Sequence, residues 1–115
     1  MTCLITGCEG FIGSHLADLI VSKELPVYGT VYEESGRLTH LQDKIVLAKC
    51  DLNDKDAITR IMRECKPDRV FHLAAQSYVT VSWNDPEITL KTNIIGTLNL
   101  LQSIMDIDTK PRIVI

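Results

Sequence analysis

Residues 6–16 read TGCEGFIGSHL, directly after the apolar run Cys3-Leu4-Ile5 and at the start of a segment with helical spacing. A strand that turns sharply into a helix leaves first-turn N–H groups unpaired, and the helix dipole adds partial positive charge there. A pyrophosphate fits such a site. Gly7 would permit the tight turn, Gly10 would let the backbone approach phosphates, and Gly13 would let the helix pack closely on the sheet. The pattern predicts a dinucleotide site, although three glycines alone also fit an ordinary strand–helix corner.

Short apolar runs alternate with segments of helical spacing along the whole chain. We expect strands at residues 2–6, 27–31, 44–50, 69–73 and 112–115, with a mostly polar loop at 32–42. Helices are expected at 10–24, from a cap at Asn53 or Asp54 to Pro67, and at 87–105 with Pro86 in the first turn. This alternation predicts an α/β fold, a Rossmann-type doubly wound parallel sheet of order 3-2-1-4-5, with the sequence ending in the fifth strand. The ligand crevice would lie between strands one and four, where residues 7–13 face residues 73–77.

Composition limits the classes of partner. Of 115 residues, 45% are hydrophobic, and 12 basic against 15 acidic residues give a formal charge of −3. We therefore expect one domain over residues 1–115, no nucleic-acid partner, no membrane span and no metal site. Met1 leads almost directly into the first strand, so no signal peptide is expected. Four cysteines without CxxC spacing suggest free thiols in a reducing cytoplasm.

A second informative run, His72-Leu73-Ala74-Ala75-Gln76-Ser77, follows the fourth expected strand. Together with TGCEGFIGSHL, Val81-Ser82-Trp83 and the segment TNIIGTL at 92–98, it resembles the extended short-chain dehydrogenase/reductase family. Within that family the chain is most similar to GDP-mannose 4,6-dehydratases and GDP-4-keto-6-deoxymannose reductases. The resemblance covers essentially all 115 residues, but only the cofactor-binding part of the family's chain.

The resemblance implies NAD or NADP as cofactor and a set of residues that hold it. Asp51 would contact the adenine, although a carboxylate there is also a favourable helix-start residue. Glu33 or Glu34 could reach a ribose 2′-hydroxyl and Arg37 a 2′-phosphate, or these could be solvated loop charges. Asn93 could hold a water or backbone group, or face solvent. The full set is Gly7, Gly10, Phe11, Ile12, Gly13, Glu33, Arg37, Asp51, Leu52, Leu73, Ala74, Ala75, Gln76, Ser77 and Asn93.

Two further residues have simpler interpretations. His72 is interpreted as structural. Cys8 lies near a helix N-terminus, where a thiolate is favoured, but we interpret it as incidental to catalysis.

The function implied by the resemblance is transient oxidation at C4 of a nucleotide sugar. The family's catalytic Tyr-x-x-x-Lys pair does not occur in this sequence, so no catalytic residue is expected in this chain. The chain would then be the N-terminal part of a longer, homodimeric enzyme that pairs through its last helix and binds a GDP- or UDP/dTDP-sugar. A UDP-glucose 4-epimerase or dTDP-glucose 4,6-dehydratase type is the alternative. A non-catalytic dinucleotide-binding module is a second alternative, and a flavodoxin-like phosphate-binding domain is a weaker third.

Overall fold

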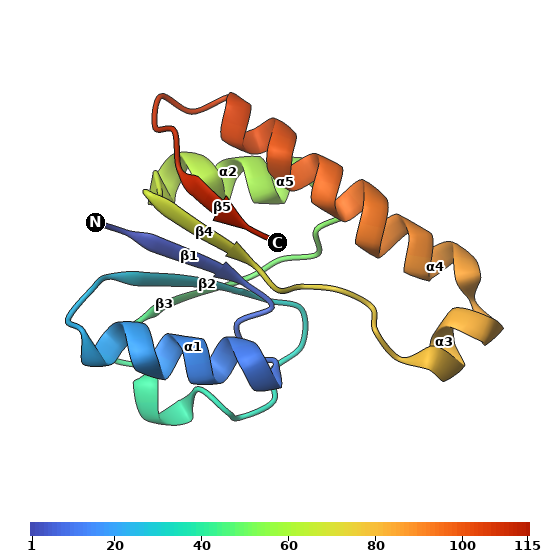
Figure 1. Ribbon diagram of the computed structural model, residues 1–115, viewed down its shortest axis with the longest axis horizontal. Coiled ribbons are helices and arrows are strands. Elements are labelled where there is room, and N and C mark those ends of the chain that lie inside the picture. The colour runs from blue at the N-terminus through green and yellow to red at the C-terminus, as the bar shows by residue number, and fades with distance from the viewer.

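A five-stranded parallel sheet forms the centre of the computed structural model, which describes residues 1–115 (Figure 1). The strands are β1 (Cys3–Thr6), β2 (Val27–Val31), β3 (Val46–Lys49), β4 (Arg69–His72) and β5 (Arg112–Val114). Their order is β3-β2-β1-β4-β5, and every neighbouring pair is parallel. The predicted strand order is therefore confirmed. None of the helices has the length and apolar character needed to cross a membrane.

Helices cover both faces of the sheet. The helix α1 (Phe11–Ser22) lies on one face, and α2 (Lys55–Cys65) and α5 (Gly96–Met105) lie on the other (Figure 1). Successive side chains of a strand point to opposite faces, so Cys3 and Ile5 join the apolar cluster on the α1 side while Leu4 joins the one beneath α2 and α5. The central strand β1 is buried along its whole length, which explains its nearly continuous apolar sequence.

The ends of α2 follow from local side-chain chemistry. The Asp54 carboxylate accepts a hydrogen bond from the Ala57 N–H at 3.1 Å, so Asp54 is the N-cap. Asn53, the other predicted cap, instead donates its own N–H to Asp51. At the far end Lys66 adopts a left-handed φ of 43°, and the buried Pro67 follows it. The helix therefore ends where the proline was expected to end it.

The last helical stretch contains a turn that the sequence did not predict. The helix α4 (Pro86–Leu90) begins with Pro86 after Asp85, whose carboxylate accepts the Ile88 N–H at 3.1 Å. A π-helical turn, η2 (Lys91–Ile95), then separates α4 from α5. The wider π-turn shifts the positions that face the sheet, and such turns often mark functional sites.

Two short helices occupy segments without predicted helix. The 3-10 helix η1 (Thr39–Leu41) lies inside the loop expected at 32–42. The helix α3 (Val79–Asn84) comes shortly after residues 73–77, the segment that leaves β4 and that we call the β4 exit. No residue of α3 is buried, and its Trp83 is 82% exposed. Without a buried face, α3 leaves no apolar spacing in the sequence to predict it from.

Candidate dinucleotide site

The candidate site lies where β1 and β4 end side by side. Thr6, the last residue of β1, is in register with His72, the last residue of β4. From there the chain turns into α1 on one face after β1, and runs out toward α3 after β4 (Figure 1). Because neighbouring connections diverge at this point, the carboxyl ends of these two strands are the place where a doubly wound sheet binds its ligand.

Residues 7–10 connect β1 to α1, and we call them the glycine turn. This turn is in close contact with the start of the β4 exit. Gly7 has a left-handed φ of +67°, which residues with a Cβ seldom adopt. A Cβ on Gly7 would also stand 2.8 Å from the backbone nitrogen of Ala74. A Cβ on Gly13 would overlap the carbonyl oxygen of Gly7, so Gly13 lets α1 pack against the turn itself. The fold therefore requires glycine at both positions, and the predicted contact between residues 7–13 and 73–77 is present.

Gly10 differs from the other two glycines, because the fold constrains it less. Its backbone is extended, with φ −69° and ψ 171°, and residues of most types adopt this conformation. A Cβ there would meet one atom, the carbonyl oxygen of Gly7, at 3.2 Å, a tight contact that the turn must relieve by a shift of a few tenths of an ångström. Gly10 is exposed, and no side chain caps the helix that it precedes. The first turn, with exposed Phe11 and Ile12, is thus open to solvent.

Cys8 is buried within the turn, and its thiol is not activated. Burial, together with the neighbouring Glu9 carboxylate, raises the pKa of the Cys8 thiol to about 12. The expectation that the helix N-terminus favours a thiolate here is therefore wrong, because desolvation outweighs the helix dipole. That Cys8 is incidental to catalysis remains a prediction.

The buried Glu9 ties the glycine turn to the loop at the ribose side. The Glu9 carboxylate accepts hydrogen bonds from the backbone N–H of Ser35 and from the Ser35 hydroxyl, the latter at 2.6 Å. Burial alone would raise the pKa of Glu9, but the Ser35 and Gly36 hydrogen bonds and the charge of Arg37 lower it below its usual value. Sequence reasoning missed Glu9, whose only signal was a carboxylate between two motif glycines.

The residues predicted to contact the ribose, Glu33, Glu34 and Arg37, are exposed and lie on the loop that Glu9 binds. Arg37 donates from Nη1 to the Glu9 carbonyl at 3.2 Å, so its guanidinium group is held beside the glycine turn. Glu33 and Glu34 are exposed and make no hydrogen bond to another side chain. Both signs of charge thus remain available on this loop.

The β4 exit is held from two directions. The hydroxyl oxygen of Thr6 accepts the backbone N–H groups of Leu73 at 3.1 Å and Ala74 at 3.2 Å. The Asn93 side chain accepts the Gln76 N–H at 2.8 Å and donates to the Gln76 carbonyl at 3.0 Å. Asn93 lies on the π-turn and holds a backbone group, which is one of the two predicted alternatives.

The remaining predicted residues fall into two groups. Ala75 and Ser77 are exposed on the β4 exit. Asp51 lies beyond β3 at the same edge of the sheet, exposed, with one carboxylate oxygen accepting the Asn53 N–H at 2.9 Å. Leu52 is buried, and its carbonyl accepts a hydrogen bond from Asn99 of α5 at 2.8 Å. Leu52 therefore supports this edge of the sheet from the core, while the second carboxylate oxygen of Asp51 is free to accept a hydrogen bond.

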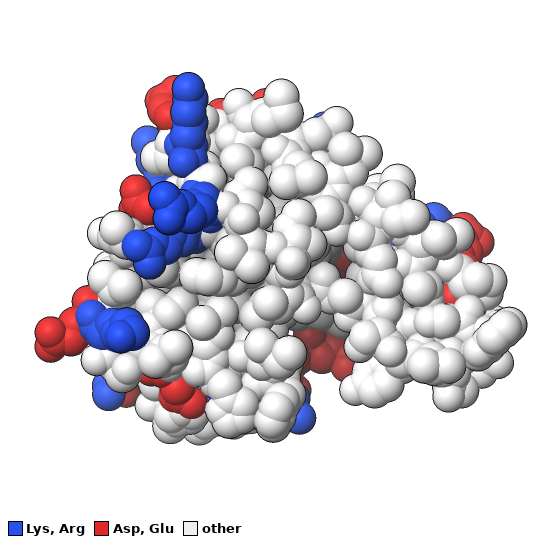
Figure 2. Space-filling view, viewed as in Figure 1, with Lys and Arg blue, Asp and Glu red and all other residues white.

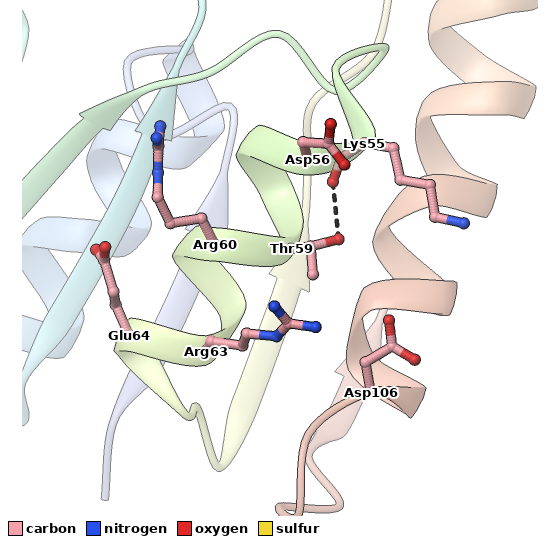
Figure 3. A pocket seen from close by; sticks show the side chains of 7 residues that line it. All are labelled: Lys55, Asp56, Thr59, Arg60, Arg63, Glu64 and Asp106. Carbon is pink, nitrogen blue, oxygen red and sulfur yellow. Dashed lines mark hydrogen bonds between the residues drawn. The ribbon is translucent and has the colours of Figure 1, made fainter.

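Charge on the viewed face is unevenly distributed. Figure 2 shows lysines and arginines gathered on the side away from α3 and α4. Acidic atoms are visible in the hollow between the part that contains α3 and α4 and the rest of the molecule. A separate surface hollow lies along α2 and reaches Asp106 (Figure 3). Only polar and charged residues line it, with Lys55, Arg60 and Arg63 interleaved among carboxylates. It has no apolar wall for a base or nicotinamide, so we do not place the site there.

The parallel sheet, the glycine turn and the facing β4 exit define a protein of the extended short-chain dehydrogenase/reductase class. A family model described as GDP-mannose 4,6 dehydratase matches residues 4–115. The chain belongs to this family.

Known proteins similar to the chain are nucleotide-sugar enzymes. It is 39% identical over 112 residues to GDP-mannose 4,6-dehydratase of Vibrio cholerae, covering 88% of this chain and 30% of that protein. It is 38% identical over 108 residues to UDP-glucose 4-epimerase of Mycolicibacterium smegmatis, covering 90% of this chain and 34% of the epimerase.

The structure of UDP-glucose 4-epimerase from Thermotoga maritima with UDP-glucose superposes with a TM-score of 0.87 at 35% identity, over 96% of this chain and 36% of that one. The epimerase of Thermus thermophilus, in complex with NAD, gives 0.85 at 35% identity, over 92% and 34%. The chain thus spans about a third of the length of these relatives.

Proposed function

We propose that residues 1–115 form the NAD(P)-binding domain of a nucleotide-sugar enzyme of the GDP-mannose 4,6-dehydratase or GDP-4-keto-6-deoxymannose reductase type. The family match and the similarity to the Vibrio cholerae dehydratase support this type over others. A UDP-glucose 4-epimerase or dTDP-glucose 4,6-dehydratase type is the second candidate, favoured by the epimerase structures. Bound NAD or NADP would supply a hydride acceptor for transient oxidation at C4 of the sugar.

The observation that carries the proposal is Gly10. The fold explains Gly7 and Gly13, whereas a Cβ at Gly10 would meet only one atom of the chain. Glycine at an exposed helix N-terminus with no capping side chain is explained if a pyrophosphate has to approach the backbone there. The other groups of the proposed site are the first-turn N–H groups of Phe11 and Ile12, Asp51 for the adenine, and residues 73–77 with Asn93 for the nicotinamide side.

The experiment is a calorimetric titration of Gly10→Val with NAD and with NADP. We expect the substitution to abolish dinucleotide binding because its side chain fills the approach to the helix N-terminus. Ser22→Val, which adds a branched side chain at the exposed other end of α1, is the control and should bind as the unmodified protein does. Unchanged affinity in Gly10→Val, with its melting temperature intact, would refute the proposal.

The choice between NAD and NADP depends on the tied loop at the ribose side. If Arg37 reads a 2′-phosphate, Arg37→Ala should lower the affinity for NADP and leave that for NAD nearly unchanged. If Glu33 accepts a bond from a 2′-hydroxyl, Glu33→Gln should lower the affinity for NAD instead. The same titrations distinguish the two outcomes.

Two wider features of the proposed enzyme follow from the surface and the cysteines. We propose a homodimer that pairs through the exposed apolar side of α4 and α5. All four cysteines are free and buried, which accords with a reducing compartment such as the cytoplasm.

A further inference from the structure

His72 is a buried ionisable side chain that the proposed site does not use directly. It is 6% exposed and lies between two hydroxyl groups from different elements. Its Nδ1 is 2.7 Å from Oγ1 of Thr6 at the end of β1, and its Nε2 is 2.9 Å from Oγ1 of Thr97 in α5. We refer to Thr6, His72 and Thr97 as the His72 relay.

Counting protons fixes the direction of every bond in the relay. The Thr97 hydroxyl donates to the Asn93 carbonyl at 2.7 Å. A hydroxyl has one proton, so Thr97 can only accept from His72, and the ring proton must be on Nε2. At the other end, Thr6 already accepts the N–H groups of Leu73 and Ala74. Its own proton is then donated to Nδ1, which is an acceptor in this tautomer.

The opposite tautomer would break bonds at both ends. A proton on Nδ1 would make Thr6 the target of three donors and leave its own proton without an acceptor. The bare Nε2 would then face the Thr97 oxygen, whose proton already goes to Asn93. Burial lowers the pKa of His72, so the ring is neutral near pH 7 and the choice between tautomers is a real one.

We propose that His72 is a positioning residue: its Nε2–H tautomer links the β1 end, the β4 exit and the π-turn into one hydrogen-bonded unit that fixes the ligand-facing backbone of residues 73–77. The inference rests on the proposed dinucleotide site. Through Thr6 the relay engages the N–H groups of Leu73 and Ala74, and Asn93 engages both backbone groups of Gln76. The Ala75 N–H and the carbonyls of residues 73–75 take part in none of these bonds. Which backbone groups remain for the dinucleotide is therefore set by the relay.

An apolar side chain of similar shape could fill the space of His72 but could not complete the relay. Only a group that accepts on the Thr6 side and donates on the Thr97 side satisfies both hydroxyls. Asparagine places an amide oxygen where Nδ1 stands, and glutamine places an amide nitrogen where Nε2 stands. These two substitutions therefore restore one half of the relay each, whereas phenylalanine restores neither.

The first measurement is the protonation of the ring nitrogens by nitrogen-15 NMR of the protein at neutral pH. We expect the proton of His72 on Nε2, with Nδ1 bare. Thr97→Val, which removes the hydroxyl that accepts from Nε2, should shift the ring toward a mixture of tautomers, and Thr97→Ser should restore the original state. A proton on Nδ1 in the unmodified protein would overturn the inference, whether or not a dinucleotide binds.

The second measurement is the affinity for NAD and NADP. We expect about a tenfold loss in His72→Phe and smaller losses in His72→Asn and His72→Gln, a size consistent with one or two lost buried hydrogen bonds. Thr97→Val should also lose affinity, while Ser103→Ala should not. Ser103 is the matched control because its buried hydroxyl in α5 bonds only within its own helix, to the Leu100 carbonyl.

The outcomes separate the two proposals. Unchanged affinity in both His72→Phe and Thr97→Val would overturn the inference while leaving the dinucleotide site in place. If the unmodified protein binds neither NAD nor NADP, the proposed function fails, and the NMR result still decides the direction of the relay. Should His72→Phe not fold, Thr97→Val provides the same comparison.

Discussion

The sulfur of Cys8 lies directly over Gly29, 2.7 Å from the position that a Cβ on that glycine would occupy. Gly29 belongs to β2, and Cys8 to the glycine turn after β1. The turn also donates the Cys8 N–H to the Thr30 carbonyl at 3.0 Å. The glycine turn is therefore packed onto the neighbouring strand, and the absence of a side chain at Gly29 in β2 allows this close approach.

Gly29→Ala is expected to lower the free energy of unfolding by about 1–3 kcal/mol, because it overpacks a fully buried contact. Cys8→Gly in the same chain should recover part of that loss, since it removes both side-chain atoms of Cys8 that a new Cβ would meet. Denaturant unfolding of the two single variants and the double variant gives the coupling energy. Strictly additive effects would mean that the two residues do not press on each other.

The Cys8 thiol should resist alkylation in the folded protein. With a pKa of about 12, the thiolate at pH 8 is on the order of one part in ten thousand, and the side chain is also buried. Mass spectrometry after a timed exposure to iodoacetamide should find Cys8 unmodified, and modified at once in denaturant. Rapid native labelling of Cys8 would contradict the burial of the turn.

Glu9 should make stability depend on pH in the acid range. Its pKa is lowered in the folded state from 4.5, so the folded state favours the charged form. The resulting stabilisation is present above about pH 4.5 and is lost as the pH falls through the lower folded value. At pH 7, Glu9→Gln should cost roughly 1–3 kcal/mol, the range for hydrogen bonds to a charged group.

The measurement for Glu9 is the urea midpoint of the protein and of Glu9→Gln between pH 3 and pH 7. The difference between them should shrink toward the acid end. Glu64→Gln, an exposed position on α2, is the control and should change little at any pH. A constant difference for Glu9→Gln would show that its carboxylate is not the titrating group.

The exposed apolar side of α4, η2 and α5 is expected to mediate self-association. Ile104 faces the core, but Leu90, Ile94, Leu98 and Met105 are between 46% and 83% exposed, so apolar side chains extend beyond the side that packs on the sheet. Sedimentation should show concentration-dependent association that Ile94→Lys weakens. Leu19→Lys is the control, since Leu19 is 53% exposed on α1. A monomer at all concentrations would exclude this prediction.

The sheet could be predicted because burial is visible in the sequence. Strands β1, β2 and β4 are short apolar runs, and α2 carries its buried residues at helical spacing. The edge strand β3 shows the limit of this argument. Val46 and Leu47 belong to the strand expected at 44–50, but they are 49% and 36% exposed, and β3 lies at the edge of the sheet.

The contacts that shape the site could not be read from the sequence, because they join distant segments. Glu9 and Ser35 are 26 positions apart, and Thr6 and His72 are 66 apart. Such bonds depend on strand register and loop path, which apolar spacing does not specify. Asn93 was recognised as a polar residue inside an apolar helix, but the π-turn that presents it was not.

Tyr78 is expected to play no part in oxidising a sugar. It follows the predicted site residues 73–77, but its side chain is 77% exposed, and only its backbone groups make hydrogen bonds. A general base has to stand within hydrogen-bond reach of the proton it removes, with its pKa tuned by neighbours. No lysine lies four residues on, where Ser82 stands, and Lys91 is bound to Glu87 at 2.8 Å. We therefore expect Tyr78→Phe to bind NAD(P) unchanged, and neither form of the 115-residue chain to reduce it with GDP-mannose or UDP-glucose. Steady growth of the reduced-nicotinamide absorbance that Tyr78→Phe abolishes would instead make Tyr78 the base of a site built differently from that of the family.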